Sequence, residues 1–476
     1  MPLVSVIMPS LNVASYISEC LDSVIHQTLK EIEILCVDAG STDGTLEIIQ
    51  EYAKKDHRIR LILSSKRSYG YQMNLGLMQA HGEYIGIVET DDFISPEMYE
   101  TLYTYAKQTN ADFVKSDFDV FTTLNQGERL FLEYSLERHS GIQYDMVYAY
   151  DDFIRRKQTI DVFIWNGIYK RSFLTAHRIR FQETPGAAFQ DCGFRYQVVW
   201  NLEKGFFLNH FLYHYRRDNI QSSTYNGKCV AFNLAEAQNL LRLVQEEFRL
   251  DKNGLHTNYV WERGDTEERL RFLAKEISVI ALAPYQELLT WGKPARESIE
   301  ALNEFRSVLK GFIDQGILDQ TSVKEDAWLE IRMFVENPEF YDYYSRLRAE
   351  IRKQNVQDFL RKVAEKEEVV LFGSGYIGAG AYCLIRNNGI HNIRAFCDND
   401  QKKWNQTYMG CRILSPDEAW RRFPHADYLI TNRVHADMIQ KQLLKSGITA
   451  QQIMRCPLSV SPLECTNIVM RLSNME

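Results

Sequence analysis

The stretch Tyr84–Ser95 reads Tyr-Ile-Gly-Ile-Val-Glu-Thr-Asp-Asp-Phe-Ile-Ser, in which an apolar run ends in three carboxylates. The run over 84–88 has the length and the β-branched content of a buried strand. Glu89, Asp91 and Asp92 follow at the point where that strand would leave its sheet. Clustered carboxylates repel one another unless a positive charge lies between them, and a divalent cation with oxygen ligands would supply that charge. The segment alone leaves two interpretations open, a metal site and a polar loop that merely ends a strand.

Strands and helices alternate in the sequence up to this stretch. The pattern predicts strands at 4–8, 33–38, 59–63 and 84–88, with helices at about 15–27, 45–54 and 73–80 between them. Such alternation predicts a parallel sheet with helices on both faces, where ligands bind beyond the carboxyl ends of the strands. Pro9, Asp38 and Asp91 lie at three such ends, so we expect them in one site. A helix-capping carboxylate is the alternative for Asp38.

Composition narrows the class of protein. The chain has 476 residues and 45% hydrophobic content, enough for two or three domains. Its net charge of −8 and its pI near 5.9 argue against a general nucleic-acid binder. Nine cysteines without a CxxC pair favour reduced thiols over a disulfide frame or a zinc site. No signal peptide or membrane-spanning run is apparent, so we expect a soluble cytoplasmic protein, at most peripheral at the inner face of the membrane.

Several segments, taken in order, resemble family 2 glycosyltransferases of the GT-A fold. They are Val4–Asn12 (Val-Ser-Val-Ile-Met-Pro-Ser-Leu-Asn), Val37–Thr45 (Val-Asp-Ala-Gly-Ser-Thr-Asp-Gly-Thr), Asn74–Gly76 with Gly82–Ile85, and Glu89–Asp92 (Glu-Thr-Asp-Asp). The resemblance covers roughly the first half of the chain. It implies a nucleotide-diphosphate sugar donor, with a UDP-sugar as the expected one, a divalent cation (Mn²⁺ or Mg²⁺) and inversion at the sugar carbon.

The resemblance also implies roles for individual residues. Asp38 would contact the nucleobase, Pro9 would shape its pocket, and Asn74 would belong to the donor site. Glu89 and Asp91 stand for the acidic DxD motif of the family. Glu89 would face the ribose or the sugar of the donor, and Asp91 would hold the metal. The side chain of Glu89 is longer than that of the usual Asp.

The segment Phe189–Phe194 looks like the acceptor half of the same family. There a Glu-Asp pair before an apolar helix commonly supplies the catalytic carboxylate. Here Gln190 replaces the Glu, and Asp191 stands in the position of the base. A carboxylate within hydrogen-bond reach takes the proton of a sugar hydroxyl as the new bond forms. The alternative is that Asp191 caps the helix predicted at 193–202.

The loop that closes this region carries two arginines, an acid and an amide close together. Because the planar guanidinium group suits phosphate, we expect Arg216 or Arg217 on the diphosphate, and Asp218 or Asn219 near the metal. A solvated loop with an internal Arg–Asp pair is the alternative. His214 is either a metal ligand or, given its aromatic neighbours, a core or stacking histidine.

The C-terminal part begins a new unit. From about 231 to 364 the pattern is helical. Val369–Gly378 then reads as a strand followed by GxGxxG opening a helix, and the next predicted strand ends in Asp398, about 20 residues on, as in a dinucleotide site. This predicts a small Rossmann-like domain. Its glycines either bind a dinucleotide or serve only the packing of strand against helix.

We therefore predict an α/β protein with a GT-A nucleotide-sugar-binding domain (1–228), a helical connector (229–364) and a small Rossmann-like domain (365–476). The predicted activity is sugar transfer to a hydroxyl of a glycan or surface-polymer acceptor, as in capsule or lipopolysaccharide synthesis. The predicted partners are the donor and the acceptor, with no nucleic acid and with the helical or C-terminal region as the candidate homo-oligomer surface. Two alternatives remain open: an NAD(P)-binding oxidoreductase centred on the C-terminal domain, and a catalytically silent scaffold that binds a sugar nucleotide.

Overall fold

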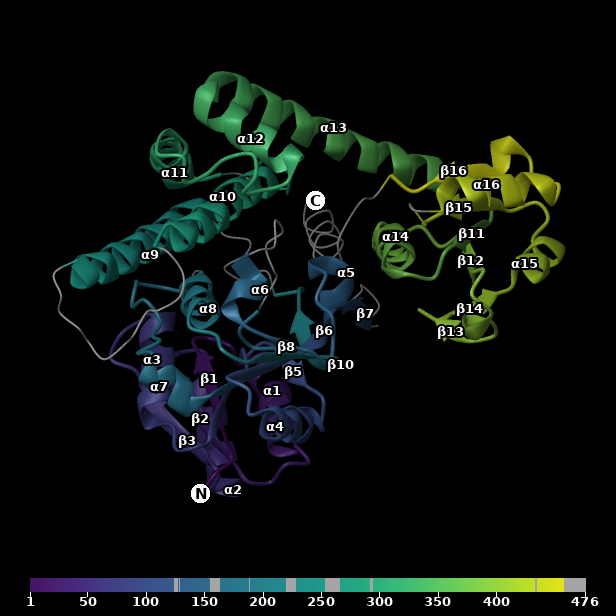
Figure 1. Cartoon of the computed structure of the whole chain (residues 1–476). Coiled ribbons are helices and arrows are strands. Elements are labelled where there is room, and N and C mark those ends of the chain that lie inside the picture. The colour runs from purple at the N-terminus through teal and green to yellow at the C-terminus, as the bar shows by residue number, and fades with distance from the viewer. Residues whose placement is uncertain are drawn as a thin grey trace. The chain divides into compact units, whose positions relative to one another are not determined.

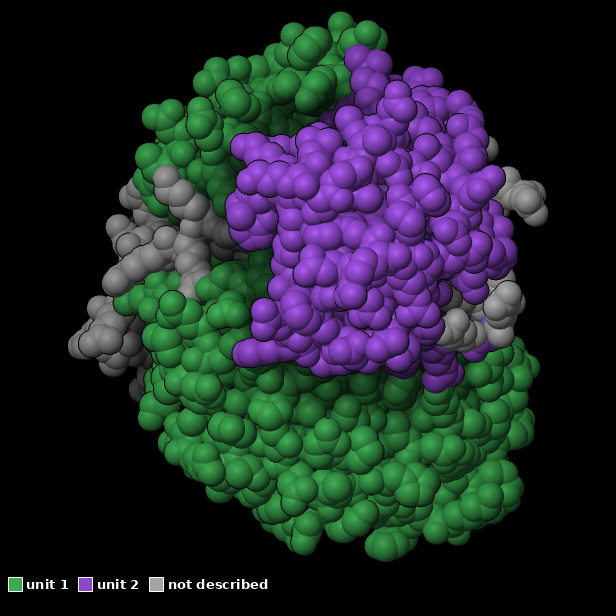
Figure 2. Space-filling model, turned by 90° about the vertical axis from the view of Figure 1, so that its right-hand side faces the viewer, with its two compact units in different colours: residues 1–118, 135–215, 219–345 green, residues 119–134, 216–218, 346–476 purple. Residues whose placement is uncertain are grey.

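The computed structural model describes residues 1–123, 127, 129–154, 163–187, 189–219, 228–252, 266–291, 294–432 and 435–457. The chain divides into two compact units, coloured separately in Figure 2. The first comprises residues 1–118, 135–215 and 219–345, and the second residues 119–134, 216–218 and 346–476. The predicted domain boundaries at 228 and 364 stay predictions.

A ten-stranded mixed sheet forms the N-terminal half of the chain (Figure 1). Its order is β3-β2-β1-β4-β9-β6-β10-β5, with β7 beside β6 and β8 beside β10. The strands are β1 (Val4–Ser10), β2 (Ile32–Asp38), β3 (Ile59–Leu63), β4 (Tyr84–Ile87), β5 (Phe93–Ile94), β6 (Phe113–Thr123), β7 (Arg129–Tyr134), β8 (Val147–Tyr148), β9 (Gly167–Lys170) and β10 (Gly205–Arg216).

The predicted parallel sheet is confirmed for the first four strands. β1 pairs in parallel with β2 and β4, and β2 pairs in parallel with β3. The sheet then becomes mixed, because β9 pairs antiparallel with both β4 and β6. β6 is one of the longer strands of this sheet and runs from Phe113 to Thr123. The register of β1 on β2 pairs Ser10 with Asp38, so both strands end at the same edge.

Helices connect these strands. They are α1 (Ile17–Ile25), α2 (Thr45–Lys55), α3 (Tyr69–Gln79), α4 (Met98–Thr109), α5 (Leu136–Ser140), α6 (Tyr150–Ile154), α7 (Arg171–Ala176) and α8 (Gln190–Trp200). α3 begins four residues before the predicted start at 73, because Ser68 caps it by accepting a hydrogen bond from the Tyr71 amide. Gly70 in its first turn lets the helix approach a neighbouring segment, since a Cβ there would lie 1.8 Å from the carbonyl oxygen of Gln182.

The helical region predicted over 231–364 is confirmed for the residues that the structure describes. It consists of α9 (Cys229–Lys252), α10 (Thr266–Trp291), α11 (Arg296–Asp314), α12 (Glu325–Glu336) and α13 (Pro338–Ala364). α9 packs on α10 and α11, and also on α8. Leu302, Phe305 and Leu309, spaced along one face of α11, are buried. The helical region therefore touches the helix that carries the predicted base.

A second, six-stranded sheet has the order β13-β14-β12-β11-β15-β16. Its strands are β11 (Val369–Phe372), β12 (Ile393–Cys397), β13 (Thr407–Tyr408), β14 (Cys411–Leu414), β15 (Asp427–Ile430) and β16 (Ile453–Arg455), with helices α14 (Tyr376–Asn387), α15 (Pro416–Arg422) and α16 (Ala436–Lys445). All pairs except the β13–β14 hairpin are parallel. The three strands predicted here are confirmed, and the five parallel strands have a doubly wound order.

Candidate active site

The ends of three strands meet at one edge of the first sheet, as predicted. Ser10 at the end of β1 pairs with Asp38 at the end of β2. The hydroxyl of Thr90 donates to the carbonyl oxygen of Pro9 over 2.8 Å, which ties the turn after β4 to the end of β1. Pro9 itself lies within β1, in register with Val37. The acidic turn and Asp38 therefore emerge on either side of β1.

Asp38 is fully buried and holds the loop that follows β2. Its Oδ1 accepts hydrogen bonds from the amides of Gly40 and Ser41, at 2.9 and 2.8 Å. Its Oδ2 accepts from the hydroxyls of Ser10 and Ser41, at 2.8 and 2.6 Å. The capping alternative is wrong, because α2 is preceded by Gly44, in a left-handed conformation with φ of 102°. The contact of Asp38 with a nucleobase stays a prediction.

Glu89 lies between a tyrosine and two further carboxylates. The hydroxyl of Tyr69, at the start of α3, donates to Glu89 Oε1 over 2.6 Å. Burial raises the pKa of Glu89 to about 8; the Tyr69 hydrogen bond opposes this rise, and the charges of Asp91 and Asp191 add to it. Both aspartates therefore act on one carboxyl group, although 100 residues of chain separate them.

Tyr213 on β10 fixes the shape of the acidic turn. Its buried hydroxyl donates to Asp92 Oδ2 over 2.7 Å and accepts a hydrogen bond from the Glu89 amide over 3.1 Å. Sequence reasoning gave Tyr69 and Tyr213 no role. Both are single aromatic residues whose spacing carries no signal, and only the folded sheet brings them to the carboxylates.

Asp91 contacts one of the residues predicted to share its site. Asn219 Nδ2 donates to Asp91 Oδ2 over 2.8 Å. Among the described residues, no group of three or more His, Cys, Asp or Glu side chains is placed to hold a metal ion. Mg²⁺ is nevertheless often held by one or two carboxylates together with the phosphates of a substrate. Asp91 fits that kind of site.

Arg216, Arg217 and Asp218 belong to the second compact unit, so only their contacts within that unit are described. Arg216 Nη1 lies 3.3 Å from Asp218 Oδ1, and its guanidinium group stands 4.6 Å from the ring centre of Phe121. The Thr123 amide also donates to Asp218 Oδ2, at 2.7 Å. The alternative for this loop was a solvated segment with an internal Arg–Asp pair. The pair is present, but Arg216 is buried and not solvated.

His214 is a stacking histidine, which agrees with one of the two interpretations of the sequence. Its ring stacks on Phe93 with centroids 4.5 Å apart, and its Nε2 lies 3.1 Å from the Ser95 hydroxyl.

Asn74 joins α3 to the segment before α8. Its amide group donates to the carbonyl oxygen of Phe181 and accepts from the Phe181 amide, both at 2.9 Å. It also donates to Glu183 Oε1 over 3.2 Å. This side chain therefore holds the segment before α8 against α3, and its predicted place in the donor site stays a prediction.

Asp191 lies in the first turn of α8. The residue before that helix, Phe189, has φ of 63°, a left-handed conformation that is uncommon for a bulky side chain. Phe189 occupies the N-cap position, so the alternative that Asp191 is the cap is wrong. Gln190, in place of the family's Glu, is buried and donates to Thr184 Oγ1 over 2.8 Å. Burial raises the pKa of the Asp191 carboxyl, and the positive charge of Arg195 opposes this rise.

A buried polar layer links Asp191 to the helical region. Glu236 on α9 is 2% exposed, accepts a hydrogen bond from the Gly193 amide, and has no hydrogen-bond partner for Oε1 among the described atoms. Burial, with a smaller contribution from the charge of Asp191, raises the pKa of Glu236 to about 8. On the same helix as Asp191, Arg195 Nη2 pairs with Glu276 Oε2 on α10 at 2.5 Å. The sequence had shown no catalytic cluster in these helices.

The helices described carry no membrane span, since none combines the required length with the required apolar character.

Two parts of the chain match known families. Residues 5–202 match the family described as glycosyl transferase family 2, and residues 365–454 match the family described as C2185-like, N-terminal. The chain is 31% identical to the uncharacterized glycosyltransferase EpsJ of Bacillus subtilis over 217 residues. The aligned stretch covers 46% of this chain and 62% of that protein. It is 30% identical to the cholesterol galactosyltransferase of Borreliella burgdorferi over 226 residues. This aligned stretch again covers 46% of this chain and 62% of that protein.

A third relative, glycosyltransferase GlyA of Streptococcus pneumoniae, is 33% identical over 218 residues, which is 45% of this chain and 30% of that protein. The chain thus covers less than two thirds of each of these relatives. Among solved structures, S. aureus TarS 1-349 in complex with UDP-GlcNAc is similar with a TM-score of 0.51 and 17% identity, over 75% of this chain and 92% of that one. At this identity the likeness shows the fold, and it confirms the predicted α/β GT-A class.

Proposed function

We propose that the chain moves a sugar from a nucleotide-diphosphate sugar to a hydroxyl group of a glycan or surface-polymer acceptor, because residues 5–202 match glycosyl transferase family 2 and the fold is of the GT-A class. One observation carries the proposal. Tyr69 donates its hydroxyl to Glu89 Oε1 over 2.6 Å and its amide to the carbonyl oxygen of Gly186 over 2.9 Å. The same carbonyl oxygen accepts from the side chain of Gln190, the neighbour of Asp191, over 3.3 Å, so the turn that carries Asp91 and the helix that carries Asp191 are joined through one tyrosine. A transferase of this kind needs one carboxylate for the leaving diphosphate and another for the incoming hydroxyl.

In the proposed mechanism Asp191 is the general base. A sugar hydroxyl is a weak nucleophile near neutral pH, and a carboxylate beside it accepts the proton while the bond to the anomeric carbon forms. The nucleoside diphosphate leaves on the opposite face, so the configuration at that carbon inverts. Burial raises the pKa of Asp191, which makes it a stronger base than an exposed aspartate, and Arg195 limits this rise.

On the donor side, we assign Asp38 and Pro9 to the nucleobase pocket and Glu89 to the ribose or the sugar. Tyr69 orients the Glu89 carboxyl through its hydrogen bond of 2.6 Å. Tyr213 holds the turn so that the backbone of Glu89 and the side chain of Asp92 keep one arrangement. Arg216 and Arg217 are the proposed cations for the diphosphate, a role that suits their planar set of donors.

We further propose that Mn²⁺ or Mg²⁺ takes part, with Asp91 as its carboxylate ligand and Asp218 or Asn219 beside it. The hydrogen bond from Asn219 to Asp91 supports this grouping. When bound, such a cation stabilises negative charge on the leaving diphosphate. The donor that we propose is a UDP-sugar, since the similar TarS structure holds UDP-GlcNAc.

The test is a screen of UDP-, GDP- and dTDP-sugars against the full chain, with and without Mn²⁺, followed by detection of released nucleoside diphosphate. We expect metal-dependent binding of at least one nucleotide sugar, and slow release of its nucleoside diphosphate without acceptor. A protein that binds such a sugar but neither hydrolyses nor transfers it with any glycan acceptor would be the silent scaffold instead.

A further inference from the structure

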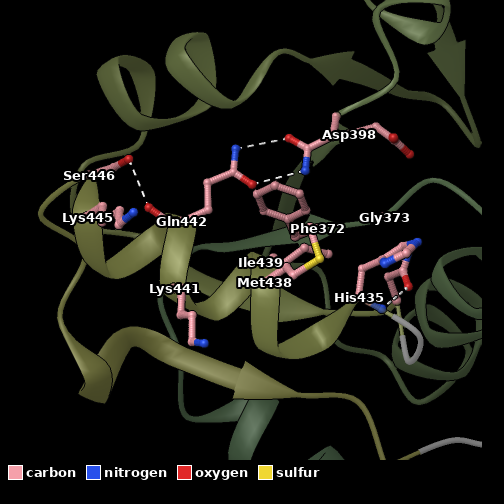
Figure 3. A pocket seen from close by; sticks show the side chains of 12 residues that line it. Phe372, Gly373, Asp398, His435, Met438, Ile439, Lys441, Gln442, Lys445 and Ser446 are labelled. Atoms are coloured by element: carbon pink, nitrogen blue, oxygen red, sulfur yellow. Dashed lines mark hydrogen bonds between the residues drawn. The ribbon is translucent and has the colours of Figure 1, made fainter.

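A cavity of about 660 Å³ lies in the C-terminal sheet, beyond the carboxyl ends of its central strands (Figure 3). Phe372 and Gly373 at the end of β11, Asp398 after β12 and Asn432 after β15 line it, and α16 forms another wall. Its size falls within the range of small-molecule sites in proteins. All of these residues belong to the second compact unit.

The topology of this sheet puts the cavity where open α/β sheets bind ligands. From β11 the chain moves to β12 and β14 on one side, and then returns to β15 on the other side of β11. The strand order therefore reverses between β11 and β15. The loops after two such strands diverge, and they leave a crevice that ligands occupy.

The glycines after β11 have different structural reasons: backbone conformation and packing require two of them, and neither requires the third. Gly373 has φ of 120°, a conformation that side chains rarely adopt. A Cβ on Gly378 would lie 2.1 Å from the Gly373 carbonyl oxygen, so that glycine is required for close packing. Gly375, which precedes α14, is different: its φ of −92° suits any residue, and a Cβ there would meet no atom within 4 Å. Packing does not explain Gly375, whereas the close approach of a ligand to the backbone does.

The wall formed by α16 is apolar and basic. Met438, Lys441, Gln442 and Lys445 have the spacing of one helix face, and all four line the cavity, while Ile439 also contacts the core. Neither lysine takes part in an ion pair among the described residues. Phe372 and Met438 both line the cavity and are labelled in Figure 3. Gln442 also lines it, and its side-chain amide exchanges two hydrogen bonds of 3.0 Å with that of Asn399.

Asp398 supplies an acceptor at the opposite wall. Its Oδ2 accepts from the amide and the hydroxyl of Ser374, at 2.9 and 2.6 Å. Among the described residues, its Oδ1 accepts a hydrogen bond from the Asp400 amide alone, at 2.9 Å. Because a carboxylate oxygen accepts about two hydrogen bonds, Oδ1 can take another donor, such as a ribose hydroxyl.

We propose that this cavity is a nucleotide site, distinct from the donor site and independent of the function proposed above. The base packs against Phe372 and Met438, and the ribose hydroxyls bind Asp398. The phosphates bind the backbone of the loop that runs from Gly373, which lines the cavity, to Gly375, and the two lysines add positive charge to the wall formed by α16. The ligand is a nucleoside phosphate. Uridine nucleotides and adenine dinucleotides share this chemistry, and the experiment below separates them.

The test is calorimetric titration of the full chain with UDP, ADP and NAD⁺. The Gly375→Val variant should fold, because the backbone angles and the open space accept a side chain, yet its methyl groups fill the place of the phosphate. We expect its affinity for the bound nucleotide to fall by about 10-fold or more, and the same for Lys441→Glu combined with Lys445→Glu. Gly311→Ala in α11, where the nearest atom to a Cβ is 3.9 Å away, is the matched control and should bind as the wild type does.

Binding of NAD⁺ or ADP that depends on Gly375 would identify an adenine site. A second UDP per chain, lost in Gly375→Val while the first remains, would identify a uridine site. The proposal is wrong if the wild type binds none of the three beyond a single UDP that Gly375→Val leaves unchanged. Failure of sugar transfer would overturn the proposed function without altering these titrations, so the two failures are distinguishable.

Discussion

The hydroxyl of Tyr69 donates a hydrogen bond of 2.6 Å to Glu89 Oε1. Tyr69 lies in the first turn of α3, and Glu89 follows β4, so the bond joins the start of a helix to the end of a strand. Burial is the largest cause of the raised pKa of the same tyrosine, and Glu89 and then Asp191 add to this rise through their charges. Tyr69 therefore lies between the carboxyl groups of Glu89 and Asp191. The first prediction concerns this tyrosine.

Tyr69→Phe should lower kcat/KM for sugar transfer by about 10- to 100-fold, because it removes the donor that orients the buried Glu89 carboxyl, and a buried acceptor left unsatisfied costs about 1–3 kcal/mol. Steady-state kinetics with a saturating acceptor would measure it. Tyr71→Phe is the matched control: its hydroxyl, on the same helix, contacts only the exposed Ser65 hydroxyl at 3.2 Å. Equal rates for the two variants would remove Tyr69 from the site.

Asp191→Asn should reduce the rate of transfer by about 100- to 10,000-fold, because amide oxygen cannot take the acceptor proton. Donor affinity should stay close to that of the wild type, since the base acts on the acceptor. Calorimetry with the nucleotide sugar and a transfer assay would separate the two effects. Asp22→Asn, an exposed change on α1, is the control and should alter neither quantity. Normal transfer by Asp191→Asn would show that Asp191 is not the general base.

Asp91→Ala should abolish the part of the nucleotide affinity that depends on Mn²⁺. Asn219→Ala, which removes the hydrogen bond to Asp91, should weaken it by a smaller factor of about 5- to 10-fold. Calorimetric titration of UDP with and without Mn²⁺ measures both. If Mn²⁺ strengthens UDP binding equally in the wild type and in Asp91→Ala, another residue holds the cation.

Glu236→Gln should change how stability depends on pH. The folded protein keeps the Glu236 proton up to a pKa of about 8, whereas the unfolded chain releases it near the ordinary value of about 4.5. Between these values the native state binds one proton more, so the free energy of unfolding falls as pH rises, by about 1.4 kcal/mol per unit for this group. The variant should lose less stability across that window.

Urea unfolding at several pH values between about 5 and 8 would measure the difference in slope. Glu325→Gln, an exposed change in the first turn of α12, should keep the wild-type slope. Identical slopes for the wild type and Glu236→Gln would mean that Glu236 is ionised in the folded protein.

Gly193→Ala should destabilise the fold by about 1–3 kcal/mol, because a Cβ there would lie 1.6 Å from Glu236 Oε1. Combining it with Glu236→Ala should recover part of the loss, since the colliding atoms are gone. A double-mutant cycle of unfolding free energies gives that coupling. Additive effects of the two changes would contradict the close contact between α8 and α9.

The sequence predicted the strands and part of the candidate site wherever an apolar run was followed directly by polar or acidic residues. Apolar runs predicted β1, β2 and β4, and parallel pairing then brings Asp38 and Asp91, the acids that end β2 and follow β4, to one edge. It was silent about Tyr69, Tyr213 and Glu236, because their importance comes from contacts across 20, 121 and 43 residues of chain with Glu89, Asp92 and Gly193. It also missed the reversal at β9, since strand direction depends on the path of a connection and not on the residues of the strand.

The reversed strand has a mechanical consequence. β9 pairs with β4, which leads into the acidic turn, and with β6, which belongs to the acceptor side. The strands on the two sides of β9 therefore share one continuous backbone ladder, and they cannot separate without breaking its hydrogen bonds. If the proposed transfer takes place here, a change of acceptor preference therefore calls for exchanging the loops at this edge with those of a relative, while the paired strands stay as they are.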